Sequence, residues 1–305
     1  GGFNNPDLNQ RDLFSACNAM IESSNELDGQ RGSATDRSLG LSEQELAAAL
    51  QDLAHEEIIT QGTMATETSS AQQANIDMRL SQLLGKVPSI SVTGLQFKQN
   101  GKTLMADALG FKYGQRGGAA GDGDAGWRKL GVFINGSIGF GEKEGTDRED
   151  AFDFDTSGIT VGVDYRLTNQ FVLGVAAGYN KLGSDIVHTA SVSGGSVDAD
   201  GYSLSGYGLY YLDNFYVNGV ITYTSNDYDI ERRVVILSNN PSIPTINRTA
   251  SANTDSDQIA FSATAGYELS REAWTFGPYA RLDYLDVDID GYTETGAGGL
   301  NLQVN

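Results

Sequence analysis

The feature that most constrains this chain is the alternation in "YRLTNQFVLGVAAGYN", residues 165–180. One set of alternate positions holds Phe171, Leu173, Val175, Ala177 and Tyr179, and the other holds Val172, Gly174, Ala176, Gly178 and Asn180. A period of two predicts a β-strand with two different faces. Either a sandwich core covers the apolar face, or lipid does and the other face lines the interior of a membrane barrel.

Seven segments after Trp127 share this period, and their connections favour the barrel. They cover about 128–140, 157–167, 171–180, 201–212, 215–224, 258–269 and 274–286. Short turns at about 167–170, 213–214 and 270–273 alternate with long loops at 141–156, 181–200, 225–256 and 287–299. In an up-and-down sheet, all the short turns then lie at one end, which is typical of outer-membrane barrels. The segments are also longer than most strands of soluble proteins, and aromatic residues gather at their ends.

The composition excludes some function classes and leaves others open. A formal charge of -20 and a pI near 4.3 argue against nucleic acid as a partner, because phosphates attract basic surfaces. No run of 18 apolar residues is present, which excludes helical membrane spans. The mean hydropathy of -0.30 decides nothing, because barrel strands alternate and average out. Cys17 has no second cysteine to pair with.

Four regions follow along the chain. Residues 1–40 are polar without a clear period, and we interpret them as a linker or the remnant of a preceding domain. Residues 41–84 are predicted to be a helical linker: Ser42 and Glu45 have the spacing of a capping box, and a second helix is expected over about 66–84. Residues 85–126 are predicted to be a flexible glycine-rich connector, and 127–305 to be the barrel domain.

The strand alternation also assigns an interior face. Charged and amide side chains are costly toward lipid and easily accommodated toward water. The residues predicted to face the lumen are Asn135, Thr160, Asp164, Arg166, Asn218, Thr264, Glu268, Arg281 and Asp283. Val175, near the middle of its strand on the other face, is predicted to contact lipid.

The chain offers few candidates for catalysis or metal binding. The segment "DVDIDG", 286–291, resembles the start of a calcium loop, but the position that needs glutamate is Ala297. His55 and His188 are isolated, and neither a serine elbow nor a phosphate loop is present. We therefore expect no catalytic residues, no metal site and no cofactor in this segment.

Several blocks resemble one known family. "LGVFINGSIGFG" (130–141), "FDFDTSGITVGVDYRLTNQFVLGVAAGY" (152–179), "GYSLSGYGLYYL" (201–212), "NDYDIERR" (226–233) and "AWTFGPYARLDYLDVDIDGYTETGAGGLNL" (273–302) are similar, in this order, to the C-terminal translocator barrel of autotransporters. The helical stretch 50–85 resembles the linker between passenger and barrel in that family. The resemblance implies a barrel of about twelve strands with a helix through its lumen and a passenger before it. Residues 1–40 would then be a passenger remnant or linker.

These observations lead to an expected function and to alternatives. The expected fold is all-β: an antiparallel up-and-down outer-membrane β-barrel, with seven complete strands and the start of an eighth in "LNLQVN", 300–305. We expect a fragment that is truncated downstream and lacks a signal peptide. Its expected function is to anchor and export an N-terminal passenger. The implied partners are outer-membrane lipid and lipopolysaccharide, the outer-membrane assembly machinery and the passenger itself. The alternatives are a surface adhesin or passive porin, and the membrane anchor of an upstream enzyme.

Overall fold

A computed structural model describes most of the chain and contains three helices in its described part. The described residues are 7–30, 36–51, 56–84, 90–99, 102–104, 129–143, 151–186, 194–267, 269–271 and 274–305. The helices are α1 (Leu8–Leu27), α2 (Glu43–Gln51) and α3 (Glu56–Leu84). No helix within the described ranges is long and apolar enough to cross a membrane.

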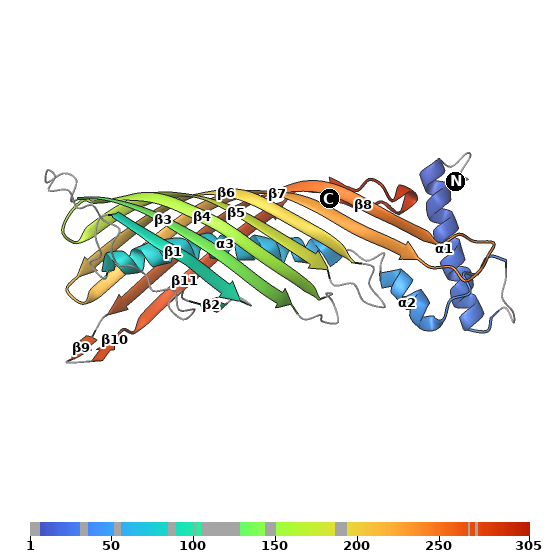
Figure 1. Cartoon of the computed structure of the whole chain (residues 1–305), viewed down its shortest axis with the longest axis horizontal. Helices are drawn as coiled ribbons and strands as arrows, with labels where there is room; N and C mark the ends of the chain where they lie inside the picture. Colours follow the sequence, from blue (N-terminus) through green and yellow to red (C-terminus); the bar gives the residue numbers. More distant parts are fainter. Residues whose placement is uncertain are drawn as a thin grey trace.

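One large curved sheet wraps around α3 (Figure 1). Its long strands are β3 (Leu130–Lys143), β4 (Phe152–Arg166), β5 (Phe171–Ile186), β6 (Gly195–Leu212), β7 (Phe215–Ile236), β8 (Ile246–Tyr267) and β11 (Tyr279–Ile289). From β4 onward, each of these strands pairs antiparallel with the long strand before it, which confirms the predicted up-and-down order. The predicted strand 274–286 starts later than expected, because Trp274–Phe276 (β10) pairs with Leu269–Arg271 (β9) in a separate hairpin.

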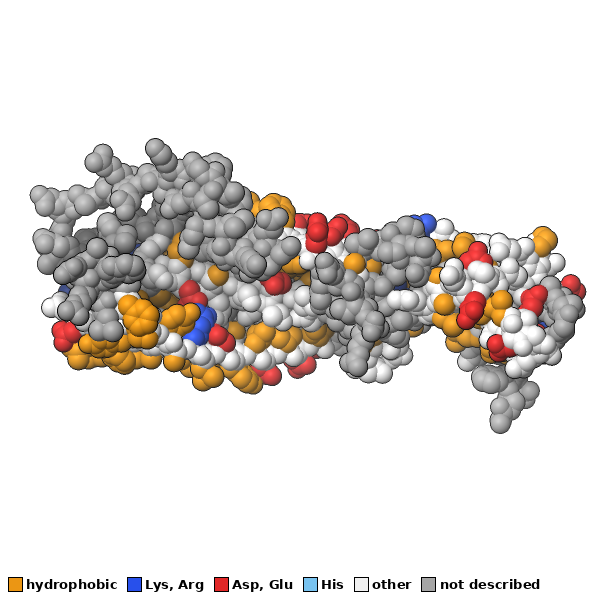
Figure 2. Space-filling model, turned by 90° about the horizontal axis from the view of Figure 1, so that it is seen from below, with side chains coloured by type: hydrophobic (Ala, Val, Ile, Leu, Met, Phe, Trp, Pro, Cys, Tyr) orange, Lys and Arg blue, Asp and Glu red, His pale blue; other side chains and the backbone are white. Residues whose placement is uncertain are grey.

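The two faces of the sheet have opposite character. Large apolar residues such as Val175, Leu204 and Ile221 are exposed on the outside, at 54%, 63% and 57% of their surface. Polar residues at the positions between them are buried on the inside. Figure 2 shows hydrophobic side chains gathered over the part of the sheet near the short turns, with acidic side chains further along. This arrangement is the reverse of a soluble protein and matches the predicted lipid-facing band.

The predicted connector 85–126 needs a correction, because part of it forms strands. Ile90–Gln99 (β1) pairs in parallel with β3, and Lys102–Leu104 (β2) pairs antiparallel with β1. A bulge between Thr93 and Leu95 restores the phase, so that Ile90, Val92, Leu95 and Phe97 all pair with residues of the outward-facing set of β3. The short, glycine-interrupted alternation of this segment hid the strand. Its glycine-rich end, 114–126, lies outside the described residues.

The end of the chain also departs from the prediction of an eighth sheet strand. Residues 300–305 do not join the large sheet. Gly298–Leu300 forms a turn of 3-10 helix (η3), and Gln303–Val304 (β13) pairs with Tyr292–Thr293 (β12) in a small hairpin. This segment folds back because Glu294 is buried against Arg232 of β7. The alternation in "LNLQVN" is therefore a property of a folded loop.

Of the two helices near the N-terminus, the start of α2 was predicted from the sequence and α1 was not. Ser42 and Glu45 form the predicted capping box, with the Ser42 amide donating to Glu45 at 2.8 Å and the Glu45 amide donating to Ser42 Oγ at 3.3 Å. Helix α1 was not predicted within 1–40. Its start is fixed by Asp7, whose carboxylate accepts a hydrogen bond from the Gln10 amide at 2.7 Å. The sequence signal of α1 is weak because its apolar residues lie on more than one side.

Three apolar clusters follow one another along the molecule. The first joins α3 to the inner face near the short turns and includes Ile76 and Leu80. The second lies further along α3 and includes Met64 and Tyr292. The third joins α1 and α2 to the projecting ends of β7 and β8. The N-terminal helices are thus packed against the end of the barrel that carries the long loops (Figure 1).

Aspartates form cross-strand pairs on the outer face, beyond the apolar band. Directly opposed pairs include Asp198 with Asp229 and Asp227 with Asp255. A hydrogen bond to Asp255 is the main cause that raises the pKa of Asp227 above 3.8, and burial and neighbouring carboxylates add to it. Burial is the main cause that raises the pKa of Asp198, with Asp185 and Asp229 also contributing. Like charges directly opposite each other destabilise a sheet.

We predict that Val175→Arg destabilises the barrel in lipid by about 2 to 4 kcal/mol, the range for a cation on the lipid face at the bilayer midplane. Urea unfolding in lipid vesicles measures the change. Val175→Leu, which keeps the position apolar, serves as the control and should stay close to the original protein. Equal stability of Val175→Arg and the original chain would refute the assignment of this face to lipid.

We predict that Asp227→Asn stabilises the sheet at pH 7 but not below the ordinary aspartate pKa of 3.8. The raised pKa means that the folded state binds a proton more tightly than the unfolded state. Stability therefore falls as the pH rises through the folded pKa. The midpoint of urea unfolding, measured at pH 7 and at a pH below 3.8, tests this prediction. Asp213→Asn removes the same charge in a short turn, where asparagine tolerates the φ of 53°, and should give no comparable gain.

Candidate functional site in the lumen

Helix α3 occupies the interior of the sheet and makes contact with several strands around it. Its polar and apolar side chains are not divided between a side facing water and a side facing a core, because the inner face of the curved sheet contacts the helix from β3 through β8 and from β11. Ile76, Leu80 and Leu83 pack into an apolar cluster with residues of β3, β5, β6 and β7. Gln72, Asn75 and Arg79 are fully buried among the inward-facing polar residues. The helix therefore fills the lumen with matched polar and apolar contacts.

A buried ion pair lies near the end of α3 closest to the short turns. Arg79 Nε donates to Asp164 Oδ2 at 2.7 Å and Arg79 Nη2 donates to Oδ1 at 3.1 Å, which is a bidentate geometry. The hydroxyl of Tyr207 donates to the same carboxylate at 3.1 Å. The Arg79 guanidinium lies 5.6 Å from the centroid of the Phe133 ring. Both charged side chains are almost fully buried.

A second group of contacts holds the middle of α3. Asn75 Nδ2 donates to Thr160 Oγ1 at 2.9 Å, and Thr160 Oγ1 donates to Gln72 Oε1 at 2.7 Å. Asn135 Nδ2 donates to the backbone carbonyl of Asn75 at 2.7 Å. Gln72 Nε2 reaches β6 at Ser205 Oγ, 3.1 Å away. Hydrogen bonds to three strands thus fix the rotation of the helix.

The predicted lumen residues fall into three groups. Five are buried on the inner face: Asn135, Thr160, Asp164, Asn218 and Thr264. Arg166 is partly buried and donates to Tyr211, whereas Arg281 and Asp283 lie at the exposed β11 edge. Arg281 nevertheless reaches α3, donating to Asp77 at 2.5 Å and to Gln73 at 3.0 Å. Glu268 lies outside the described residues.

Sequence reasoning missed two aromatic residues that complete the site. Phe133 breaks the alternation of its strand, and the structure places its ring inside, where it packs edge-on against Tyr207 at 6.1 Å. The irregular residue in an otherwise regular strand was the available signal. Glycines on neighbouring strands make the space: a Cβ at Gly162 would overlap the Phe133 ring, and one at Gly131 would overlap Arg79 and Asp164.

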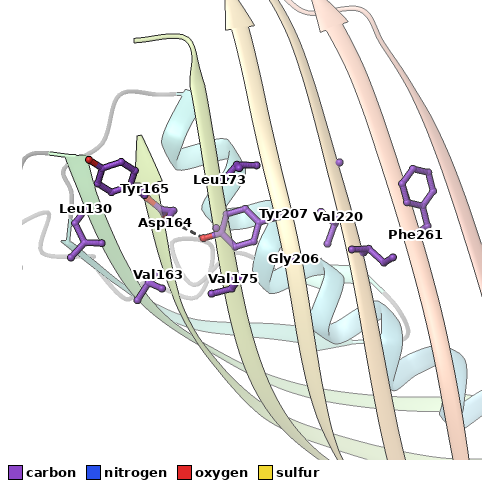
Figure 3. A pocket seen from close by; sticks show the side chains of 13 residues that line it. Leu130, Val163, Asp164, Tyr165, Leu173, Val175, Gly206, Tyr207, Val220 and Phe261 are labelled. Atoms are coloured by element: carbon purple, nitrogen blue, oxygen red, sulfur yellow. Dashed lines mark hydrogen bonds between the residues drawn. The ribbon is translucent and has the colours of Figure 1, made fainter. Parts of the chain in front are cut away.

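An apolar groove of about 550 Å³ lies on the other side of the sheet, over the same strands. Figure 3 shows Val163, Leu173 and Val175 around it, with the Tyr207–Asp164 hydrogen bond behind. The groove opens on the outward face, and its lining offers almost no free polar group. Within the described residues, no three acidic, histidine or cysteine side chains gather to hold a metal. The polar and apolar groups of the site therefore serve to hold a helix.

We predict that Asp164→Ala costs about 3 to 5 kcal/mol in stability, because it removes the carboxylate that pairs with the buried Arg79 charge. Urea unfolding in detergent micelles measures the loss. The double variant Arg79→Met with Asp164→Leu removes both charges and should lose much less. An unchanged stability of Asp164→Ala would contradict the burial of Arg79 in the lumen.

Comparison with known proteins identifies the fold. The family model described as "Autotransporter beta-domain" matches residues 132–305. Esterase EstA of Pseudomonas aeruginosa is 27% identical over 186 residues, which cover 58% of this chain and 27% of that protein. Outer membrane protein B of Rickettsia japonica is 29% identical over 152 residues, 49% of this chain and 9% of that protein.

A solved structure is also similar. The translocator domain of the autotransporter NalP from Neisseria meningitidis gives a TM-score of 0.49 at 13% identity, over 78% of this chain and 65% of that chain. The chain spans about a quarter or less of the length of the two relatives above. The family model, however, covers more than half of the chain. This protein therefore belongs to the autotransporter β-domain family and is an outer-membrane translocator barrel of a Gram-negative bacterium.

Proposed function

We propose that this barrel exports a passenger that precedes α1 and keeps α3 in its lumen afterwards. The observation that carries the proposal is the direction of α3. Its C-terminal half contacts Asp164, near the turn 167–170, whereas its N-terminal half packs with the projecting parts of β6, β7 and β8. Short turns of outer-membrane barrels face the periplasm. The chain before α3 then lies on the outside of the cell.

The same contacts argue for a helix that stays in place. A passive porin needs an open lumen, but here hydrogen bonds and a buried ion pair join α3 to β3, β4 and β6. The alternative of an adhesin rests on the long loops, and no contact within the described parts of those loops favours it. We therefore propose export and anchoring, in preference to passive conduction, as the function of the barrel.

We propose that the barrel has no catalytic role of its own. The family is that of a translocator, and the esterase relative shares only 27% of its length with this chain. An enzymatic activity would then belong to a passenger outside the matched part. Lipid and lipopolysaccharide are proposed to contact the outer face, and the outer-membrane assembly machinery is proposed to insert the strands.

We predict that Cys17 is labelled by a membrane-impermeant maleimide on intact cells that express the chain. This residue is exposed on α1, which the proposal places outside. A matched control is Asp213→Cys in a Cys17→Ser background, because residue 213 lies in a short turn. That cysteine should react only after the outer membrane is permeabilised. Labelling of Asp213→Cys but not of Cys17 on intact cells would reverse the proposed orientation.

A further inference from the structure

The turn at 296–300 receives helix α1 at very close range. A Cβ at Gly299 would overlap the backbone carbonyl of Asn9 and lie 2.6 Å from the backbone nitrogen of Leu13. The Gly299 amide donates to Asp12 Oδ2 at 2.9 Å. Arg248 of β8 pairs with the same carboxylate, with Nη2 2.9 Å from Oδ1. A residue with any side chain at position 299 would therefore keep the helix from this position.

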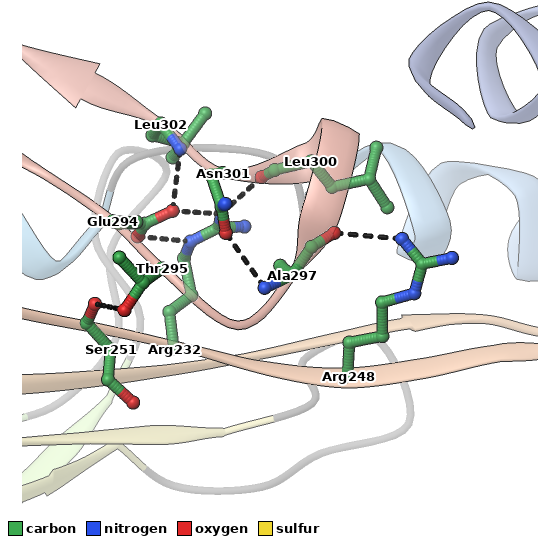
Figure 4. Close-up of polar contacts among 9 residues, drawn as sticks. All are labelled: Arg232, Arg248, Ser251, Glu294, Thr295, Ala297, Leu300, Asn301 and Leu302. Carbon is green, nitrogen blue, oxygen red and sulfur yellow. Dashed lines mark hydrogen bonds and ion pairs between the residues drawn. The ribbon is translucent and has the colours of Figure 1, made fainter. Parts of the chain in front are cut away.

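The barrel builds this turn with its own residues. Arg248 Nη1 donates to the carbonyl of Ala297 at 2.8 Å, and Arg232 Nη2 donates to that of Leu300 at 2.9 Å. Glu294, 3% exposed, accepts from Arg232 and from the Leu302 amide. Figure 4 shows these contacts converging from β7 and β8 on the turn. The site is thus organised by groups that do not belong to α1.

An apolar core extends the contact beyond the turn. Its buried residues include Ala16 and Met20 from α1, Leu46 from α2, Val234 and Ile236 from β7, and Leu300 from the turn. The segment between the helices is fixed as well. The amide of Asn239 donates to the carbonyl of Leu39 at 2.8 Å, and Asn240 Nδ2 donates to that of Ser38 at 2.7 Å. Charge pairing, backbone hydrogen bonds and apolar burial therefore converge on one segment of the chain.

Asp12 stays ionised under ordinary conditions. The hydrogen bond from Arg248 is the main cause that lowers the pKa of Asp12 below 3.8, and the Gly299 amide also contributes. The partner of Arg248 therefore carries its charge at neutral pH. An ion pair this exposed contributes little free energy by itself, so we assign it to orienting α1 and assign the stability to the apolar core.

We propose that the turn 296–300, together with the projecting parts of β7 and β8, is a docking site that captures α1 after it leaves the pore and so holds α3 in the lumen. This inference rests on the export function proposed above. Because α1 precedes α3 in the chain, it reaches the docking site only when residues 7–51 have passed to the side of the long loops. Once α1 is docked, backward movement of α3 has to break the apolar core as well as the lumen contacts.

The test uses Gly299→Ala in the full chain, purified in detergent micelles, with a nitroxide spin label on Cys17. Cys17 is exposed on α1, so the label reports the motion of α1 without entering the core. We expect an immobilised spectrum for the original chain and loss of the immobilised component in Gly299→Ala. The matched control is Gly277→Ala, where, among the described residues, a Cβ comes within 4 Å of the Tyr267 carbonyl alone, at 4.0 Å. Its spectrum should remain immobilised.

A second readout tests retention of α3. The same three proteins are compared for ion conductance in planar bilayers. We expect more frequent openings for Gly299→Ala than for the original chain or Gly277→Ala. An immobilised Cys17 label in Gly299→Ala would overturn the docking site. A mobile label with unchanged conductance would overturn the role of docking in holding α3. The result of the maleimide experiment on whole cells is independent of the spin-label and conductance results, because it reports only on which side of the membrane α1 lies.

Discussion

A sheet whose outer face is apolar has to place its polar side chains inside, and the rest of this structure depends on how that interior is filled. Inward-facing hydroxyl, amide and carboxylate groups are costly when they lack partners in a dry space. Helix α3 supplies partners at several levels: Gln72 and Asn75 meet Thr160, and Arg79 meets Asp164. Apolar contacts through Ile76 and Leu80 fill the space between them. Helix α3 is therefore part of the core of the barrel.

The barrel also extends beyond its apolar band, and this extension gives the N-terminal helices something to pack on. Strands β7 and β8 each run for 22 residues, about twice what is needed to cross a bilayer. Past the band their inward residues change from polar groups such as Thr222 to apolar ones such as Val234 and Ile236. An apolar inner face outside the membrane needs a cover, and α1, α2 and the turn at 296–300 provide it.

The period-two alternation was sufficient to predict the seven long strands, their order and the lipid-facing band. It did not predict the extensions of β7 over 225–236 and of β8 over 246–257, because the range 225–256 was expected to be a long loop. The alternation of a strand is a local property of the chain, so it can be recognised in a single sequence. The partners of the lumen residues could not be predicted in the same way, because Arg79 and Asp164 lie 85 positions apart and only the rotation of α3 brings them together. The strand β1 was missed because Gly94 shifts its phase at a bulge. Helix α1 was missed because its apolar residues lie on more than one side, and its buried residues pack against partners far away in the sequence, such as Leu300.

Glycines mark the places where a helix meets this barrel, and the two kinds of place differ physically. In the lumen, Gly131 and Gly162 leave room for side chains: the Arg79–Asp164 pair and the ring of Phe133. At the docking site, Gly299 leaves room for backbone, the carbonyl of Asn9 and the amide nitrogen of Leu13. A side chain can change its rotamer to relieve a collision, but a helix backbone can only move as a whole. The lumen therefore tolerates small adjustments of α3 in place, whereas the docking site accepts α1 fully or not at all.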